Sequence, residues 1–157
     1  MPTPNDALDT LAARLREERD QALAQLRRAE QQLQGVMRQS EQLDGFRGET
    51  LQRFGAAEGQ ATSPDQLRHL HHFIGRVDEA LLQQQGAIEQ ARKRCERSRA
   101  LLVGVELRLA SVDKLLARRA QQAAEIQRRR EQKQSDEFAS RSAWNRLHGE
   151  GAAPGLH

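Results

Sequence analysis

Apolar residues recur at alternating spacings of three and four along the second half of the chain, from Leu67 to Leu116. Thirteen of the fifteen positions in this row are apolar. The row consists of Leu67, Leu70, Ile74, Val77, Leu81, Gln84, Ile88, Ala91, Cys95, Ser98, Leu102, Val105, Leu109, Val112 and Leu116. A 3.5-residue period sustained over this length, with charged residues between, is typical of a coiled coil. We therefore predict one long helix with a narrow apolar seam.

A weaker row of the same kind precedes it, and ten of its fourteen positions are apolar. The row consists of Leu8, Ala12, Leu15, Arg19, Ala22, Leu26, Ala29, Leu33, Val36, Ser40, Leu43, Arg47, Thr50 and Phe54. Gly35, Gly45 and Gly48 each cost about 1 kcal/mol in a helix relative to Ala, so the end of this helix is expected to be pliant. Asn5 or Asp6 is the predicted cap at its start.

The stretch "GAAEGQATSPDQL" separates the two rows. Gly55 and Gly59 favour the end of one helix, and Ser63 followed by Pro64 favours the start of the next. Two long helices joined by a short loop fold back antiparallel, so the predicted fold is an all-α, antiparallel two-helix coiled-coil hairpin. The predicted boundaries are helix one at 5–57, a turn at 58–63, helix two at 64–142 and a disordered tail at 143–157.

The predicted helices differ in length, so the second overhangs the first from about residue 117. Charge is concentrated there. The chain has 25 basic and 22 acidic residues, a net charge of +3. Residues 118–141 hold seven basic and four acidic residues, also a net +3, and the other 18 of each sign cancel. Aromatic residues are only 3% of the chain, which indicates a thin core.

Sequence signals for catalysis are weak. The one cysteine, Cys95, fits a small apolar seam residue in a reducing cytosol. His69, His71 and His72 are interpreted as solvated helix-face residues, with a metal site as the alternative. A two-helix hairpin offers no pocket that excludes water, so we expect neither an enzyme nor a cofactor. No apolar run is long enough to cross a membrane, and the first residues lack the pattern of a secretory signal.

Two arginine clusters allow three interpretations. The two clusters are "RKRCERSR" (Arg92–Arg99) and Arg128–Arg130. A solvated charged face, a protein-binding basic surface and a nucleic-acid-binding surface all remain open. No aromatic residue lies among these arginines to stack on bases, which disfavours nucleic acid.

Three segments together resemble the FliJ family of the bacterial flagellar type III export apparatus. They are "EQLDGFRGETLQRF" (Glu41–Phe54), "HHFIGRVDEALLQQQ" (His71–Gln85) and "REQKQSDEFASR" (Arg130–Arg141). The resemblance covers about residues 6 to 146. It implies a cytoplasmic stalk, similar to that of rotary ATPases, whose two chain ends enter the hexameric flagellar export ATPase. It also implies contact with the cytoplasmic domain of the membrane export gate, the escort of export chaperones, and a place at the cytoplasmic face of the flagellar basal body, reached through partners only.

The resemblance places the export-gate contact near the loop. The matching positions are Gln39, Leu43, Phe46, Thr50, Phe73, Val77, Ala80 and Gln84. The family often has an aromatic residue where this chain has the small, polar Thr50.

The ATPase-ring contact is expected in the overhang, because this part combines the excess charge with Ile126 and Phe138, which have no seam to enter. The candidate residues are Arg118, Arg119, Ile126, Arg128, Arg129, Arg130, Lys133, Asp136, Glu137, Phe138 and Arg141. Alternative functions are a generic coiled-coil scaffold that self-associates, the analogous stalk of a virulence-type secretion system, and an arginine-rich nucleic-acid-binding helix.

Overall fold

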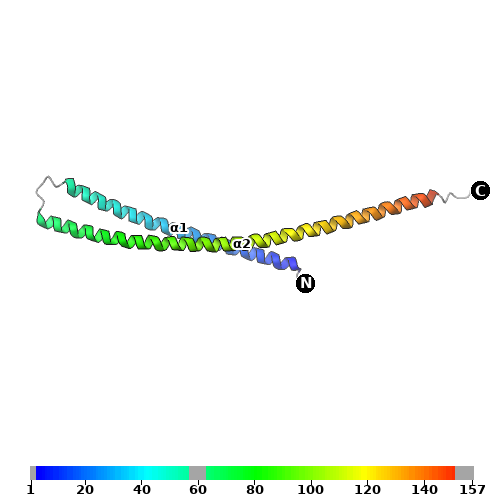
Figure 1. Cartoon of the computed structure of the whole chain (residues 1–157), viewed down its shortest axis with the longest axis horizontal. Helices are drawn as coiled ribbons and strands as arrows, with labels where there is room; N and C mark the ends of the chain where they lie inside the picture. Colours follow the sequence, from blue (N-terminus) through cyan, green and yellow to red (C-terminus); the bar gives the residue numbers. More distant parts are fainter. Residues whose placement is uncertain (1–2, 57–62, 151–157) are drawn as a thin grey trace, which may run out of the picture. The chain divides into compact units, whose positions relative to one another are not determined.

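The computed structural model describes residues 3–56 and 63–150, and these form two long helices. Helix α1 spans Pro4–Ala56 and helix α2 spans Pro64–Glu150 (Figure 1). The described residues include no strand. The all-α helical hairpin predicted from the two apolar rows is confirmed.

The first helix starts with a reciprocal cap. The Thr3 hydroxyl accepts a hydrogen bond from the Asp6 backbone N–H at 3.2 Å, and the Asp6 carboxylate accepts one from the Thr3 backbone N–H at 2.7 Å. This second bond lowers the pKa of Asp6. The N-cap is therefore Thr3, not Asn5 or Asp6, because Pro4 takes the first helical position, where no N–H is needed.

Helix α2 starts at Pro64, where the sequence pattern placed it. The Ser63 side chain accepts a hydrogen bond from the Gln66 backbone N–H at 3.2 Å, which satisfies one of the donors left open in the first turn. The predicted turn at 58–63 otherwise lies outside the described residues.

The end of α2 differs from the prediction, because residues 143–150 are helical and not part of a disordered tail. The Trp144 and His148 rings stack with their centroids 3.9 Å apart, and a ring nitrogen of His148 is 3.0 Å from the Trp144 carbonyl oxygen. Side chains four residues apart lie on one helix face, so this pair supports the last turns. Residues 151–157 lie outside the described part of the chain.

The chain divides into two compact units. The larger unit comprises Ala13–Leu109, and the terminal unit comprises Met1–Ala12 together with Ala110–His157. In the larger unit α1 and α2 lie side by side (Figure 1). Arg47 contacts Asp78 at 2.6 Å and Glu30 contacts Arg99 at 3.6 Å. Residue numbers rise along α1 where they fall along α2, so the helices are antiparallel.

The two apolar rows form the seam. Every position of both rows is buried or half-buried except Leu67, which lies close to the start of α2 and is exposed. The centre of the seam in the larger unit consists largely of small side chains. Among them, Ala22, Ala29, Ala91 and Cys95 are all buried. Small residues let helix backbones approach closely, so the core is thin, as the low aromatic content indicates.

The terminal unit contains the end of the helix pairing. Near the start of α1, the Asn5 side-chain oxygen accepts a hydrogen bond from the Arg119 guanidinium at 3.3 Å. Beyond Arg119 no α1 residue remains for α2 to pack on. From Ala120 to Gly149 every residue is exposed except Ser142, which is half-buried.

Candidate interaction surfaces

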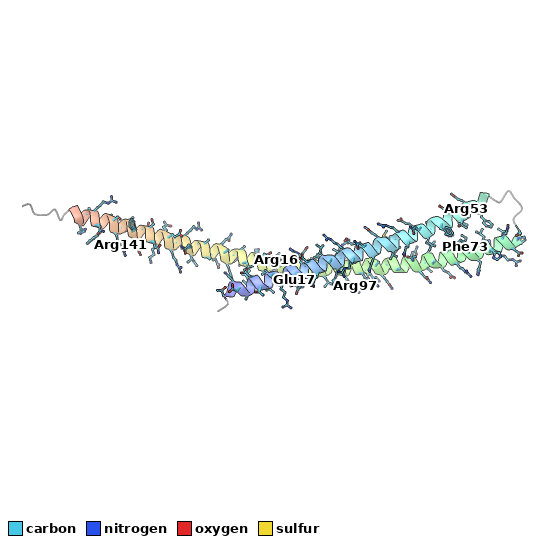
Figure 2. All side chains as sticks on the ribbon, turned by 180° about the vertical axis from the view of Figure 1, so that it is seen from behind. Arg16, Glu17, Arg53, Phe73, Arg97 and Arg141 are labelled. Carbon is cyan, nitrogen blue, oxygen red and sulfur yellow. The ribbon has the colours of Figure 1, made fainter. Side chains whose placement is uncertain are left out.

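The first candidate surface lies near the loop in the larger unit and is centred on two aromatic rings. Phe46 on α1 and Phe73 on α2 meet edge to face, with ring centroids 5.8 Å apart and planes at 75°. Phe46 is 51% exposed and Phe73 38% exposed, so both rings contact each other while presenting area to solvent. Figure 2 places Phe73 at the loop end, near Arg53 of the facing helix. Such partly exposed aromatic pairs are suited to anchoring a partner.

An ion pair fixes the two helices beside these rings. The Arg47 guanidinium donates a hydrogen bond to the Asp78 carboxylate at 2.6 Å. This hydrogen bond and the negative charge of Asp78 raise the pKa of Arg47. The pair is partly solvated, so it contributes more to the alignment of the helices than to their stability.

The eight positions of this loop-end surface differ in burial. Val77 is buried in the seam, and Leu43, Thr50, Ala80 and Gln84 are half-buried. Gln39, Phe46 and Phe73 are exposed. The Thr50 hydroxyl donates a hydrogen bond to the Phe46 carbonyl oxygen, one turn earlier on the same helix, at 2.8 Å. The structure therefore brings Phe46 and Phe73 together on the surface and gives Val77 to the core.

Gln84 is an unusual seam residue. Its Oε1 atom is buried and accepts no hydrogen bond from the described residues. A buried acceptor without a donor costs roughly 1–3 kcal/mol. The layer of the seam at Gln84 is thus weaker than the alanine and cysteine layers nearer the middle of the chain.

The second candidate surface is the basic segment, residues 118–141, in the terminal unit. Arg119 is half-buried and bonded to Asn5, and the other predicted positions are exposed. Ile126 is 52% exposed and Phe138 is 73% exposed. Arg129 pairs with Glu125 on its own helix at 2.7 Å. Because successive residues are 100° apart on a helix, Arg128, Arg129 and Arg130 point in different directions and do not form one basic stripe.

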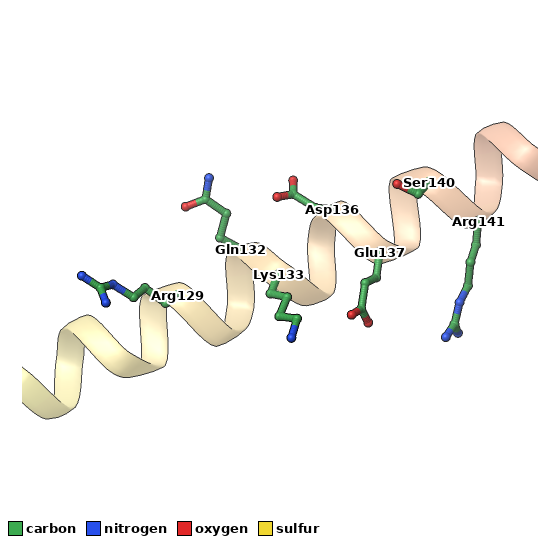
Figure 3. Close-up of a pocket in the computed structure, with 7 residues that line it drawn as sticks. All are labelled: Arg129, Gln132, Lys133, Asp136, Glu137, Ser140 and Arg141. Carbon is green, nitrogen blue, oxygen red and sulfur yellow. The ribbon is translucent and has the colours of Figure 1, made fainter.

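Part of this segment forms a shallow groove of about 530 Å³ along one side of α2. Figure 3 shows two rows of side chains, one with Gln132, Asp136 and Ser140, the other with Lys133, Glu137 and Arg141. The second row alternates in charge along the helix, so the groove suits a polar partner that also carries both signs. Gln132 and Ser140 were not among the predicted contacts, since neither is charged nor apolar.

Two exposed apolar side chains beyond the predicted segment were missed. Trp144 is 60% exposed and Leu147 is 74% exposed. Together with Ile126 and Phe138 they make the exposed end of α2 more apolar than its charge suggests. The i,i+4 spacing of Trp144 and His148 was the sequence signal that could have indicated helical turns, and hence an exposed helix face, at these residues.

The described residues include no cluster suited to binding a metal ion. His69, His71 and His72 are exposed, and no group of three or more His, Cys, Asp or Glu in the described ranges is placed to hold a metal ion. Neither described helix contains a stretch apolar and long enough to cross a membrane.

A comparison with family models matches residues 4–148 of this chain to a model described as "Flagellar FliJ protein". Comparison with curated proteins and with solved structures found no match. The family match covers both candidate surfaces.

Proposed function

The chain belongs to the FliJ family, whose members are components of the flagellar export apparatus, and from this premise we propose that it acts as a stalk. Its basic segment would bind in the centre of the hexameric export ATPase. Its loop-end surface would bind the cytoplasmic domain of the export gate, at the cytoplasmic face of the basal body. Export chaperones would be further partners of the same chain.

The observation that carries the proposal is the exposure of α2 beyond Arg119. Some thirty residues of helix, from Ala120 to Gly149, are exposed except for the half-buried Ser142, yet they include Ile126, Phe138, Trp144 and Leu147. An isolated helix in water gains little stability from propensity alone. A partner that covers these side chains would contribute roughly 1.5–3 kcal/mol for each large apolar residue that it buries fully. The net positive charge of residues 118–141 favours a partner with an acidic lining.

The loop-end surface supports the second contact. Phe46 and Phe73 are held against each other by packing and beside the Arg47–Asp78 pair, so a partner would meet them already oriented. A preorganised aromatic anchor loses little entropy on binding.

The decisive experiment measures ATP hydrolysis by the purified export ATPase with the full chain and with a chain truncated after Ala120. The truncated chain keeps the Asn5–Arg119 bond and the whole larger unit. We expect it to retain the helicity and melting of the hairpin but to lose the stimulation of ATP hydrolysis. Full stimulation by the truncated chain would contradict the proposal.

The scaffold alternative predicts another outcome. If the exposed end of α2 instead served self-association, the full chain would sediment as an oligomer, the truncated chain as a monomer, and neither would alter ATP hydrolysis.

A further inference from the structure

A second basic feature lies in the middle of the larger unit, far along the chain from the basic segment. It is a groove of about 290 Å³ between α1 and α2, which we call the arginine groove. It is lined by Gln25, Arg28, Ala29, Gln32, Arg94, Arg97 and Ser98. Figure 2 places Arg97 on the part of α2 that lies beside α1. We propose that this groove binds an acidic peptide segment of a partner protein.

The charge of the groove is the first argument. Its lining includes three guanidinium groups and no carboxylate. None of Arg28, Arg94 and Arg97 forms an ion pair within the described residues. Three positive charges around one groove, without a carboxylate in its lining, leave a positive potential that an anion can use.

The carboxylates nearest in sequence do not line the groove. Glu30 follows the groove residue Ala29 but pairs with Arg99 at 3.6 Å and does not line the groove. Glu96 stands between Arg94 and Arg97 in sequence, yet it too is absent from the lining. The lining of the arginine groove thus carries no negative charge.

The chemistry of the other lining residues favours a peptide over a nucleic acid. Gln25 and Gln32 each carry an amide that both donates and accepts hydrogen bonds, as a peptide main chain requires, whereas a phosphate backbone only accepts. The buried Ala29 has no long side chain to obstruct the floor. Arginine forks match carboxylates bidentately, and no aromatic residue lines the groove to stack on a base.

The test uses a fluorescein-labelled hexaglutamate peptide as the probe and the full-length chain at about 150 mM salt, where the screening length is about 8 Å. One variant carries Arg28→Gln, Arg94→Gln and Arg97→Gln. The matched control carries Arg38→Gln, Arg68→Gln and Arg76→Gln, which removes the same charge from exposed positions outside the arginine groove and both candidate surfaces. All six side chains are exposed, so both variants should keep the wild-type helicity and melting temperature.

We expect fluorescence anisotropy to show that the groove variant binds the peptide at least about tenfold more weakly, since each lost charged hydrogen bond weakens binding by that order. The control variant should bind as the wild type does. Equal losses in the two variants, loss in the control alone, or no binding by the wild type would overturn the proposal. So would tighter binding of an oligothymidylate than of hexaglutamate with the same dependence on the groove arginines, since this would assign the groove to nucleic acid.

Discussion

At the scale of single residues, the helices contain several glycines that the packing does not require. An added Cβ at Gly35, Gly45, Gly48, Gly75 or Gly86 would meet no atom within 4 Å, and none of these residues has a positive φ. Most of them lie toward the loop, in the same region as the buried, unpartnered Gln84 oxygen. Local stability is therefore expected to be lower there than at the alanine and cysteine layers.

Replacing Gly45 by alanine should raise the free energy of unfolding by about 1 kcal/mol, because alanine favours the helix and no contact opposes its methyl group. Urea unfolding followed by circular dichroism measures the change. Gly48→Ala is a matched second site and should behave in the same way. A loss of stability in both variants would show that this part of α1 needs its glycines.

A charge placed in the seam should have the opposite effect. Leu109 is 6% exposed, and Leu107, two residues away, is 64% exposed. Leu109→Asp should destabilise the hairpin by several kcal/mol, roughly 3 or more, because a carboxylate cannot stay hydrated inside the closed seam. Leu107→Asp is the control and should change the melting temperature little. Equal melting of the two variants would argue against burial of Leu109.

At the scale of the helices, the prediction from sequence succeeded where a repeated pattern carried it. Twenty-nine seam positions were assigned from spacing alone, and only Leu67 is exposed, since one apolar period fixes which face of a long helix is buried. Single local features were harder to predict. Thr3 in place of Asn5 or Asp6 as the cap, and the helical turns at 143–150, depend on individual side-chain bonds that periodicity does not encode.

The candidate surfaces were predicted less completely than the fold. Spacing placed Val77 in the seam, where it is buried, but it cannot tell that Phe46 and Phe73 touch, since this depends on the register between two helices. The arginine groove shows the same limitation. Its three arginines come from both helices, and the sequence gives no sign that Arg28 lies with Arg94 and Arg97.

For helix α2, reversing the charges at Arg128, Arg129 and Arg130 to Glu should weaken binding to the ATPase ring, and the effect should shrink as salt rises, because all three side chains are exposed and screened. Binding is measured by surface plasmon resonance at two ionic strengths. The control reverses Arg27, Arg38 and Arg76, three exposed arginines of the larger unit. If both variants lose affinity equally, net charge alone would explain the binding.

At the scale of the whole molecule, two units with different compositions share two continuous helices. The larger unit has a seam along its length, whereas most of α2 in the terminal unit has none. The net charge of the chain equals that of residues 118–141. The family match extends across both units.

The hairpin should form within one chain. Spin labels at the exposed positions Arg38 and Gln90 should lie about 20 Å apart, from 8–10 Å between packed helix axes plus the label arms. Electron paramagnetic resonance on labelled chain diluted with excess unlabelled chain measures this distance. Dilution should leave it unchanged. If the distance disappeared on dilution, the two helices would be pairing between chains, as the scaffold alternative requires.

The single cysteine of the chain has a consequence for measurement. Cys95 is 3% exposed and lies in the middle of the seam, so a thiol reagent reaches it only when the helices separate there. The ratio of its alkylation rates in the native and unfolded chain therefore reports the free energy of local opening without any added label. The alkylation rate of Cys95 in the unmodified protein thus reports how often α1 and α2 separate, and a partner that holds the two helices of the larger unit together would lower this rate.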